Sequence, residues 1–130
     1  MVQEQGLSSV QAHSKLIFIV EDDTIMVEFL VTAISDETPY HVIAFHNGYE
    51  ALEAVKEIKP HLFILDYLLP GMNDLGLYDQ LHAREEAADT PTIMYSTVLP
   101  TKEVQKRHIT ALCKPFDLGE LLYTIDALLA

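Results

Sequence analysis

The chain has 130 residues, enough for one domain of ordinary size, and its composition of 49% hydrophobic and 22% charged residues is typical of a soluble globular protein. Eight Lys and Arg residues against twenty Asp and Glu residues leave a formal net charge of -12, which disfavours direct binding to a nucleic acid. A single cysteine excludes an internal disulfide, and no apolar run approaches the ~20 residues of a membrane-spanning helix, so we expect a cytoplasmic protein that contacts no membrane.

A polar segment precedes the first predicted element. Residues 1–14 are rich in Gln and Ser and lack the basic start and apolar run of a secretory signal, so we expect a flexible extension before a single domain at residues 15–130. Residues 16–20 then form a short apolar run, which is typical of a strand buried on both faces. This run stops abruptly at three acids, residues 21–23.

Further apolar runs alternate with segments of helical periodicity along the rest of the chain. Predicted strands cover residues 16–20, 40–45, 61–65, 91–95 and 109–113, and predicted helices cover residues 25–34, 49–59, 75–84 and 118–129. The helix at residues 49–59 should turn Leu52, Val55 and Ile58 inward. Asp117 is a candidate cap for the last helix.

The alternation of strands and helices predicts an α/β fold with a parallel sheet, because each parallel pair needs a crossover and a helix supplies it. Ligands bind such sheets beyond the carboxyl ends of the strands. The sequence places five polar residues at these ends: Glu21, Asp22, Asp66, Ser96 and Lys114. Three carboxylates brought together repel one another unless a cation holds them ionised, which indicates Mg²⁺, a cation that prefers oxygen ligands.

Four segments at these strand ends resemble the receiver domains of two-component response regulators. The segments are residues 17–23 (Ile-Phe-Ile-Val-Glu-Asp-Asp), 62–66 (Leu-Phe-Ile-Leu-Asp) with Pro70-Gly71-Met72, 91–97 (Pro-Thr-Ile-Met-Tyr-Ser-Thr) and 114–116 (Lys-Pro-Phe). They occur in the family's order, with 44 positions from Asp22 to Asp66 and 30 from Asp66 to Ser96, and the resemblance extends from about Lys15 to the C-terminus. It implies a flavodoxin-like, doubly wound sheet of five parallel strands in the order 2-1-3-4-5, with helices on both faces.

The resemblance also implies which residues hold the cation. Asp66 would be the phosphoacceptor, which forms an aspartyl phosphate. Asp22, Asp66 and the carbonyl oxygen of Leu68 would bind Mg²⁺ directly. Glu21, a variant of the more usual Asp, would act directly or through a bound water.

The remaining implied roles concern the phosphoryl group. The Ser96 hydroxyl and the Lys114 ammonium would each bind one of its oxygens, and the Lys114-Pro115 bond would be cis. The implied function is a phosphorylation-activated switch that accepts a phosphoryl group from a histidine kinase or a histidine phosphotransfer protein and signals to a downstream effector protein. It would not be an enzyme, apart from catalysing its own phosphorylation at Asp66 and its autodephosphorylation.

The sequence departs from the family's pattern near the last predicted strand. Ala111, three positions before Lys114, stands where the family usually carries an aromatic residue that swings inward on activation, and Tyr95 is a candidate substitute. The interval of 18 positions from Ser96 to Lys114 is shorter than usual by roughly one helical turn of ~3.6 residues. Together with Pro100, this predicts a fourth helix that is short or irregular.

Other interpretations remain open. A receiver-like interaction module would keep the fold and signal without phosphorylation, although the intact set of polar residues favours a phosphorylation switch. A flavodoxin-like cofactor binder would need Gly, Ser or Thr after the first strand to hold a phosphate, and the acids at residues 21–23 would repel one. Asp23 is more readily interpreted as a helix cap, and Cys113 as a small buried residue.

Overall fold

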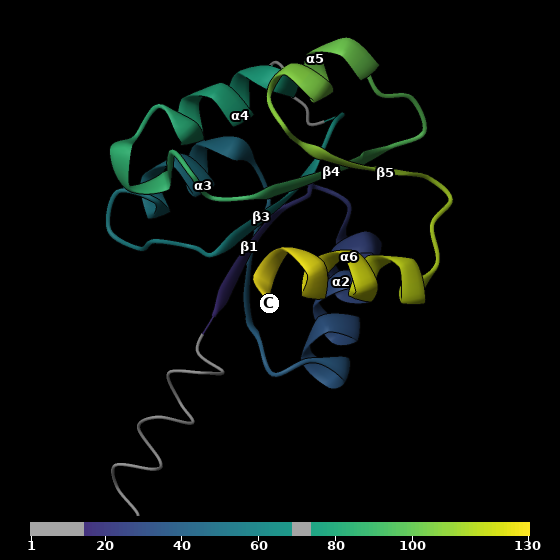
Figure 1. Cartoon of the computed structure of the whole chain (residues 1–130). Helices are drawn as coiled ribbons and strands as arrows, with labels where there is room; N and C mark the ends of the chain where they lie inside the picture. The colour runs from purple at the N-terminus through teal and green to yellow at the C-terminus, as the bar shows by residue number, and fades with distance from the viewer. Residues whose placement is uncertain (1–14, 69–73) are drawn as a thin grey trace, which may run out of the picture.

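The computed structural model describes residues 15–68 and 74–130 as an α/β fold (Figure 1). The strands are β1 (Leu16–Val20), β2 (His41–Phe45), β3 (Leu62–Asp66), β4 (Thr92–Ser96) and β5 (Thr110–Cys113). The helices are α2 (Thr24–Glu37), α3 (Gly48–Ala54), α4 (Asp74–His82), α5 (Thr101–Lys106) and α6 (Leu118–Leu129), with a 3₁₀ turn, η1 (Glu85–Ala87), before β4. Two expected features, the extension at residues 1–14 and the Pro70-Gly71-Met72 loop, lie outside the described residues.

The strands form one parallel, 5-stranded sheet in the order β2-β1-β3-β4-β5, which confirms the expected fold. The inner strands β3 and β4 are buried at every position, as their apolar runs predict, whereas β2 and β5 form the partly exposed edges. From β1 the chain moves outward to β2 and then returns past β1 to β3. The carboxyl ends of β1 and β3 therefore flank the point where the strand order reverses, the usual ligand position in such sheets.

Helices cover both faces of the sheet and bury two apolar layers (Figure 1). On one face, Leu30 of α2 and Ile125 of α6 belong to a buried cluster with Ile19 of β1. On the other face, Leu81 of α4 belongs to a second buried cluster with Phe63 of β3, which also includes residues of α3 and α5. Alternate residues of each inner strand enter opposite apolar layers. The polar residues of the predicted site lie instead at the carboxyl ends of the strands, at one edge of the sheet.

Helix α3 is shorter than the sequence predicts. The expected helix covers residues 49–59, but the observed one ends at Ala54. The N–H groups of residues 56 and 57 bond to carbonyl oxygens three residues back, at 3.3 and 3.1 Å, so the helix tightens into a turn instead of continuing. Val55 is buried as predicted, whereas Ile58 is 40% exposed, which corrects its expected inward position.

The remaining helix predictions are confirmed within a few residues. Helix α5 has 6 residues, as the shortened interval before Lys114 predicts. The side chain of Asp23 accepts the N–H of Ile25 at 2.9 Å and caps α2, and the side chain of Asp117 accepts the N–H of Glu120 at 2.7 Å and caps α6. None of the helices that the structure describes has both the length and the apolar character needed to cross a membrane.

One minor prediction is wrong. Cys113 is exposed, although a lone cysteine in an apolar strand was expected to be buried. The strand β5 forms an edge of the sheet, and its Leu112 is the residue that faces the core. A residue next to Leu112 in the strand points the opposite way, and on this edge it reaches solvent.

Candidate functional site

Three carboxylates meet at the carboxyl ends of β1 and β3. Glu21 and Asp22 follow β1, and Asp66 is the last residue of β3. Each offers one oxygen atom to a group whose members all lie within 4.8 Å of one another. Glu21 and Asp66 are buried, with 1% and 8% exposure, whereas Asp22 is exposed. These donors are all oxygen atoms, which fits a hard cation such as Mg²⁺.

Hydrogen bonds hold both carboxylate oxygens of Glu21. The backbone N–H of Asp23 donates to Oε2 at 2.9 Å, and the Tyr95 hydroxyl donates to Oε1. Burial raises the pKa of Glu21 to about 7, and the nearby charge of Asp66 acts in the same direction, whereas these two hydrogen bonds oppose the increase. Burial is thus the main cause of the raised Glu21 pKa, and the repulsion between carboxylates that the sequence predicts is a smaller contribution.

Asp66 and Ser96 end neighbouring strands, β3 and β4. An oxygen of Asp66, Oδ1, accepts the N–H of Leu68 at 3.0 Å, and the Ser96 Oγ accepts the N–H of Val98 at 3.4 Å. Ser96 is 1% exposed. Each polar side chain is therefore oriented by the first residues of the loop that follows its own strand.

Lys114 follows β5 and is aligned with the end of β4. Its backbone N–H donates to the carbonyl oxygen of Ser96 at 2.8 Å, and its Nζ lies 5.0 Å from the centroid of the Tyr95 ring. The Lys114-Pro115 peptide bond is cis, as the resemblance implies. The structure thus brings every polar residue predicted for the site to the same edge of the sheet.

The sequence did not reveal the contacts of Tyr95. This residue has 0% exposure, and its hydroxyl bonds to Glu21, which lies 74 positions away in the chain. Burial raises the pKa of Tyr95, and the hydrogen bond and charge of Glu21 raise it further. The available signal was a tyrosine inside an apolar strand, because a buried hydroxyl needs a partner. The identity of that partner depends on the pairing of distant strands.

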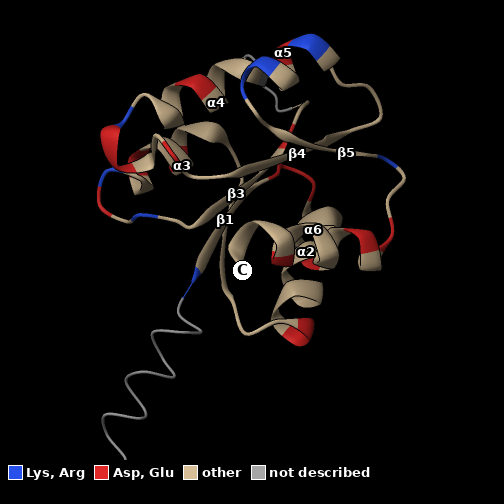
Figure 2. Cartoon of the chain, in the orientation of Figure 1, with Lys and Arg blue, Asp and Glu red and all other residues tan. Residues whose placement is uncertain are grey.

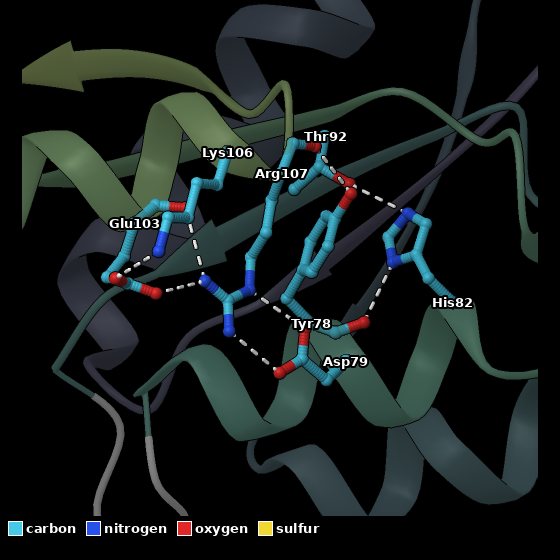
Figure 3. Close-up of polar contacts among 7 residues, drawn as sticks. All are labelled: Tyr78, Asp79, His82, Thr92, Glu103, Lys106 and Arg107. Atoms are coloured by element: carbon cyan, nitrogen blue, oxygen red, sulfur yellow. Dashed lines mark hydrogen bonds and ion pairs between the residues drawn. The ribbon is translucent and has the colours of Figure 1, made fainter.

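A second set of contacts, also missed, fixes the chain between β4 and β5 to helix α4 (Figure 3). The guanidinium of Arg107 binds both carboxylate oxygens of Asp79 at 2.8 and 3.0 Å, and it binds Oε1 of Glu103 at 2.9 Å. The Tyr78 hydroxyl donates to the backbone carbonyl of Arg107 at 2.8 Å. Only the Glu103 contact, with its helical spacing of four, could have been predicted from sequence.

Comparisons with known proteins agree with this geometry. A family model described as the response regulator receiver domain matches residues 17–126. The DNA-binding response regulator MtrA of Mycolicibacterium paratuberculosis is 30% identical over 115 residues, covering 85% of this chain and 49% of that protein. Protein PilH of Pseudomonas aeruginosa is 28% identical over 116 residues, covering 86% of this chain and 96% of that protein. The chain thus spans about half the length of MtrA and nearly the whole of PilH.

Solved structures show the same fold. The chemotaxis protein CheY4 of Vibrio cholerae has a TM-score of 0.80 at 23% identity, covering 88% of this chain and 98% of that chain. The receiver domain of the sensor histidine kinase PA1611 of Pseudomonas aeruginosa, with a magnesium ion coordinated in its active site cleft, has a TM-score of 0.79 at 18% identity. That match covers 89% of this chain and 98% of the other.

Proposed function

The chain belongs to the response regulator receiver domain family, and on this basis we propose that it is a phosphorylation-activated switch of a two-component or phosphorelay system. The observation that carries the proposal is the cluster of Glu21, Asp22 and Asp66 at one edge of the sheet. Ser96 and Lys114 lie at the same edge and are joined to each other through the backbone. A carboxylate nucleophile, further acids for a cation, a hydroxyl and an ammonium are the groups that phosphoryl transfer to a protein carboxylate needs.

In this proposal the cation is Mg²⁺, and Glu21, Asp22, Asp66 and the carbonyl oxygen of Leu68 would hold it. Three of these residues already offer carboxylate oxygens within 4.8 Å of one another, and Mg²⁺ prefers such ligands. The magnesium in the cleft of the PA1611 receiver domain supports the assignment by analogy. When bound, the cation supplies positive charge that offsets the charge of the transferring phosphoryl group.

The proposed reaction starts with the Asp66 carboxylate. One of its oxygens attacks the phosphorus atom of a phosphohistidine or of a small acyl phosphate, and a phosphorus–oxygen bond forms. The bond from phosphorus to the donor's nitrogen or oxygen breaks, and the donor leaves with that electron pair. Lys114 would move from the Tyr95 ring to a phosphoryl oxygen, and the Ser96 hydroxyl would donate to another.

The proposed partners are proteins. A histidine kinase or a histidine phosphotransfer protein would donate the phosphoryl group, and an effector protein would bind the phosphorylated form. The DNA binding named for MtrA is not carried over, because this chain matches 49% of that protein and has a formal net charge of -12. A cytoplasmic location remains part of the proposal, since the chain and the proposed phosphoryl donors would have to share a compartment for Asp66 to react.

Intact-mass measurement after incubation with acetyl phosphate and Mg²⁺ tests the proposed function. The wild type should gain the mass of one phosphoryl group, and Asp66→Asn should gain none. Asp89→Asn, which replaces an exposed aspartate after η1, is the matched control and should be phosphorylated like the wild type. A wild type that remains unmodified, or an Asp66→Asn variant that is modified equally well, would favour a receiver-like module that signals without phosphorylation.

A further inference from the structure

Tyr95 touches residues on both sides of the proposed site. It is the penultimate residue of β4, and its side chain is fully buried on the face of the sheet that α2 and α6 cover. The Phe116 ring packs edge-on against it, with 5.8 Å between ring centroids and 71° between the planes. Because the ring already lies inside the protein, Tyr95 does not replace the missing aromatic at Ala111 by swinging inward.

The hydroxyl of Tyr95 acts on the cation side of the site. With the Tyr95 hydroxyl on Oε1 and the Asp23 N–H on Oε2, both oxygens of Glu21 accept hydrogen bonds from the protein. The plane of this carboxylate is therefore fixed before a cation binds. Glu21 is one methylene longer than the usual Asp, and this length carries its carboxylate to the hydroxyl. Without the hydroxyl, a buried oxygen would lose its donor, which is costly.

The ring of Tyr95 acts on the phosphoryl side. The Lys114 Nζ lies 5.0 Å from the ring centroid, a separation at which an ammonium is attracted to the face of an aromatic ring. Within the described residues, Lys114 forms no ion pair with a carboxylate at 4.0 Å or less. An aliphatic residue in place of Tyr95 would offer Lys114 no such surface.

We propose that Tyr95 is a positioning residue for phosphoryl transfer: its hydroxyl fixes Glu21 for Mg²⁺ binding, and its ring holds Lys114 at the phosphoryl side of the site until transfer begins. The inference rests on the proposed function and adds a residue to it. Mutation of a partner that orients a metal ligand typically weakens metal binding or activity by roughly 10- to 100-fold. The two halves of the proposal predict separate defects, because the hydroxyl and the ring contact different residues.

Three substitutions separate these halves from a merely structural role. Tyr95→Phe removes the hydroxyl and keeps the ring, whereas Tyr95→Leu removes both. Tyr40→Phe is the matched control, because it removes another tyrosine hydroxyl that donates to a carboxylate, that of Asp126 at 3.1 Å. Tyr40 precedes β2, at the end of the sheet opposite to the proposed site. If Tyr95 had only a packing role, its variants would lose stability, but Tyr95→Phe would not show a specific loss of Mg²⁺ affinity.

Two quantities are measured for each variant: the Mg²⁺ dissociation constant by calorimetry, and the rate of phosphorylation by acetyl phosphate at saturating Mg²⁺. Tyr95→Phe should weaken Mg²⁺ binding roughly 10-fold or more, the usual effect of losing a partner that orients a metal ligand. Its rate at saturating Mg²⁺ should stay close to that of the wild type. Tyr95→Leu should also lower this rate, and Tyr40→Phe should change neither quantity.

A double-mutant cycle tests the contact directly. Glu21→Asp shortens the carboxylate side chain, so adding Tyr95→Phe to it should change the Mg²⁺ dissociation constant much less than it does in the wild type. A measurement on the wild type does not depend on the folding of a variant: Mg²⁺ should perturb the ultraviolet absorbance of tyrosine. The variant Tyr67→Phe should retain this change, which would exclude Tyr67 as its source. Additive effects, an unaltered Mg²⁺ affinity in Tyr95→Phe, or a silent tyrosine spectrum would each overturn the role of the hydroxyl.

Failure of the proposed function would look different. If the wild type binds Mg²⁺ but never acquires a phosphoryl group on Asp66, the phosphorylation switch is wrong. The Mg²⁺ affinities of the Tyr95 variants can still be measured in that case, and a weaker affinity in Tyr95→Phe would still support its action on Glu21. If Tyr95→Leu is phosphorylated as fast as Tyr95→Phe at saturating Mg²⁺, the role of the ring is overturned.

Discussion

Asp22 is the exposed carboxylate of a cluster whose other two members are buried. We predict that Mg²⁺ stabilises the fold through this cluster, because a ligand that binds only the native state at ~100 times its dissociation constant contributes about 2.7 kcal/mol. The melting temperature of the wild type should therefore increase with Mg²⁺ concentration, and that of Asp22→Ala should not. Thermal unfolding followed by circular dichroism measures both.

The control for this prediction is Asp36→Ala, which removes an exposed carboxylate near the other end of α2. This variant should keep the wild-type response to Mg²⁺, since its carboxylate is remote from the cluster. An equal response in Asp22→Ala would show that the cation binds elsewhere.

Two apolar side chains near the proposed acceptor bear on the lifetime of the phosphorylated form. Leu68 and Val98 are 61% and 72% exposed, and they follow Asp66 and Ser96 by two positions each. Family members that hydrolyse quickly often place polar groups there, which orient the attacking water. We therefore expect slow dephosphorylation, and faster decay in Leu68→Asn and in Val98→Glu.

Loss of the phosphoryl mass after removal of the donor gives these decay rates. The control is Ile58→Asn, a polar substitution at an exposed residue that precedes β3, at the end of the sheet opposite to Asp66. Its phosphorylated form should decay like that of the wild type. Decay that is unchanged or slower in both site variants would contradict the prediction.

Residue-level prediction from sequence succeeded where a residue's position follows from the end of a strand. Asp66 and Ser96 end apolar runs, so a parallel sheet necessarily places them on one edge. The bond from Tyr95 to Glu21 could not be inferred in this way, because it depends on which distant carboxylate the buried hydroxyl meets. Local pattern gives the direction of a side chain but not the identity of its partner.

Helix α5 and the segment before it are the elements on which activation should act. Val98 is exposed, and Pro100 at the start of α5 provides no side-chain cap. In contrast, Val104 is 3% exposed and Arg107 is bound to α4, so the later part of the segment is held in place. This unequal packing narrows the expected site of rearrangement to the residues that follow Ser96.

We predict that phosphorylation orders or shifts residues 98–108 rather than swinging an aromatic residue inward, because Ala111 offers none. Drawing Ser96 toward a phosphoryl oxygen would move the residues after it, and such order changes are common in phosphorylation switches. Amide hydrogen exchange with and without beryllofluoride should show its largest change at residues 98–101 and a smaller one near Arg107. Unchanged protection across residues 98–108, with changes elsewhere, would sink the idea.

The ion pair between α4 and Arg107 leads to a pH prediction. The hydrogen bond from Arg107 lowers the pKa of Asp79, with burial opposing it in part. The folded protein thus has a lower Asp79 pKa than the unfolded chain, so the stability it contributes is present at neutral pH and is lost as the pH falls through the folded value. Asp79→Asn should lower the free energy of unfolding at pH 7 by about 1 kcal/mol or less, since the pair is partly exposed.

Urea unfolding at pH 7 and near pH 3 measures this difference between wild type and Asp79→Asn. The difference should shrink at the lower pH, because the stability that ionised Asp79 contributes is lost as the pH falls below the pKa of the unfolded chain. Glu53→Gln removes one partner of the exposed pair with Lys56 and should have little effect at either pH. A difference that is equal at both pH values would contradict the assigned role of the ion pair.

Among the elements, strands were predicted better than helix ends. An apolar run in a parallel sheet has no alternative position, whereas the end of α3 depends on whether its last turn tightens, which periodicity does not report. The short α5 was predictable because the interval before Lys114 leaves little room for a longer helix. The bond from Arg107, the C-cap of α5, to Asp79 was not predictable, because Asp79 belongs to a different helix, α4.

At the scale of the whole molecule, the formal net charge of -12 is the dominant electrostatic feature. Figure 2 shows acidic residues spread over helices on both faces of the sheet, with basic residues concentrated on α5. Three of the chain's eight Lys and Arg residues lie at residues 102–107. Negative charges therefore repel one another over most of the surface. The repulsion is stronger in the folded state than in the unfolded chain, because folding brings the charges closer together.

The last prediction concerns this repulsion. Without Mg²⁺, the melting temperature should increase when NaCl is raised from about 0.01 M to about 0.15 M, because the Debye length falls from ~30 Å to ~8 Å. A gain of about 1 kcal/mol would correspond to roughly 4 °C in a domain of this size. Two exposed residues at the amino-terminal end of the sheet provide opposite tests: Glu86→Gln should weaken the salt response, and Lys59→Gln should strengthen it. Equal salt responses in both variants would show that net charge does not limit the stability of the fold.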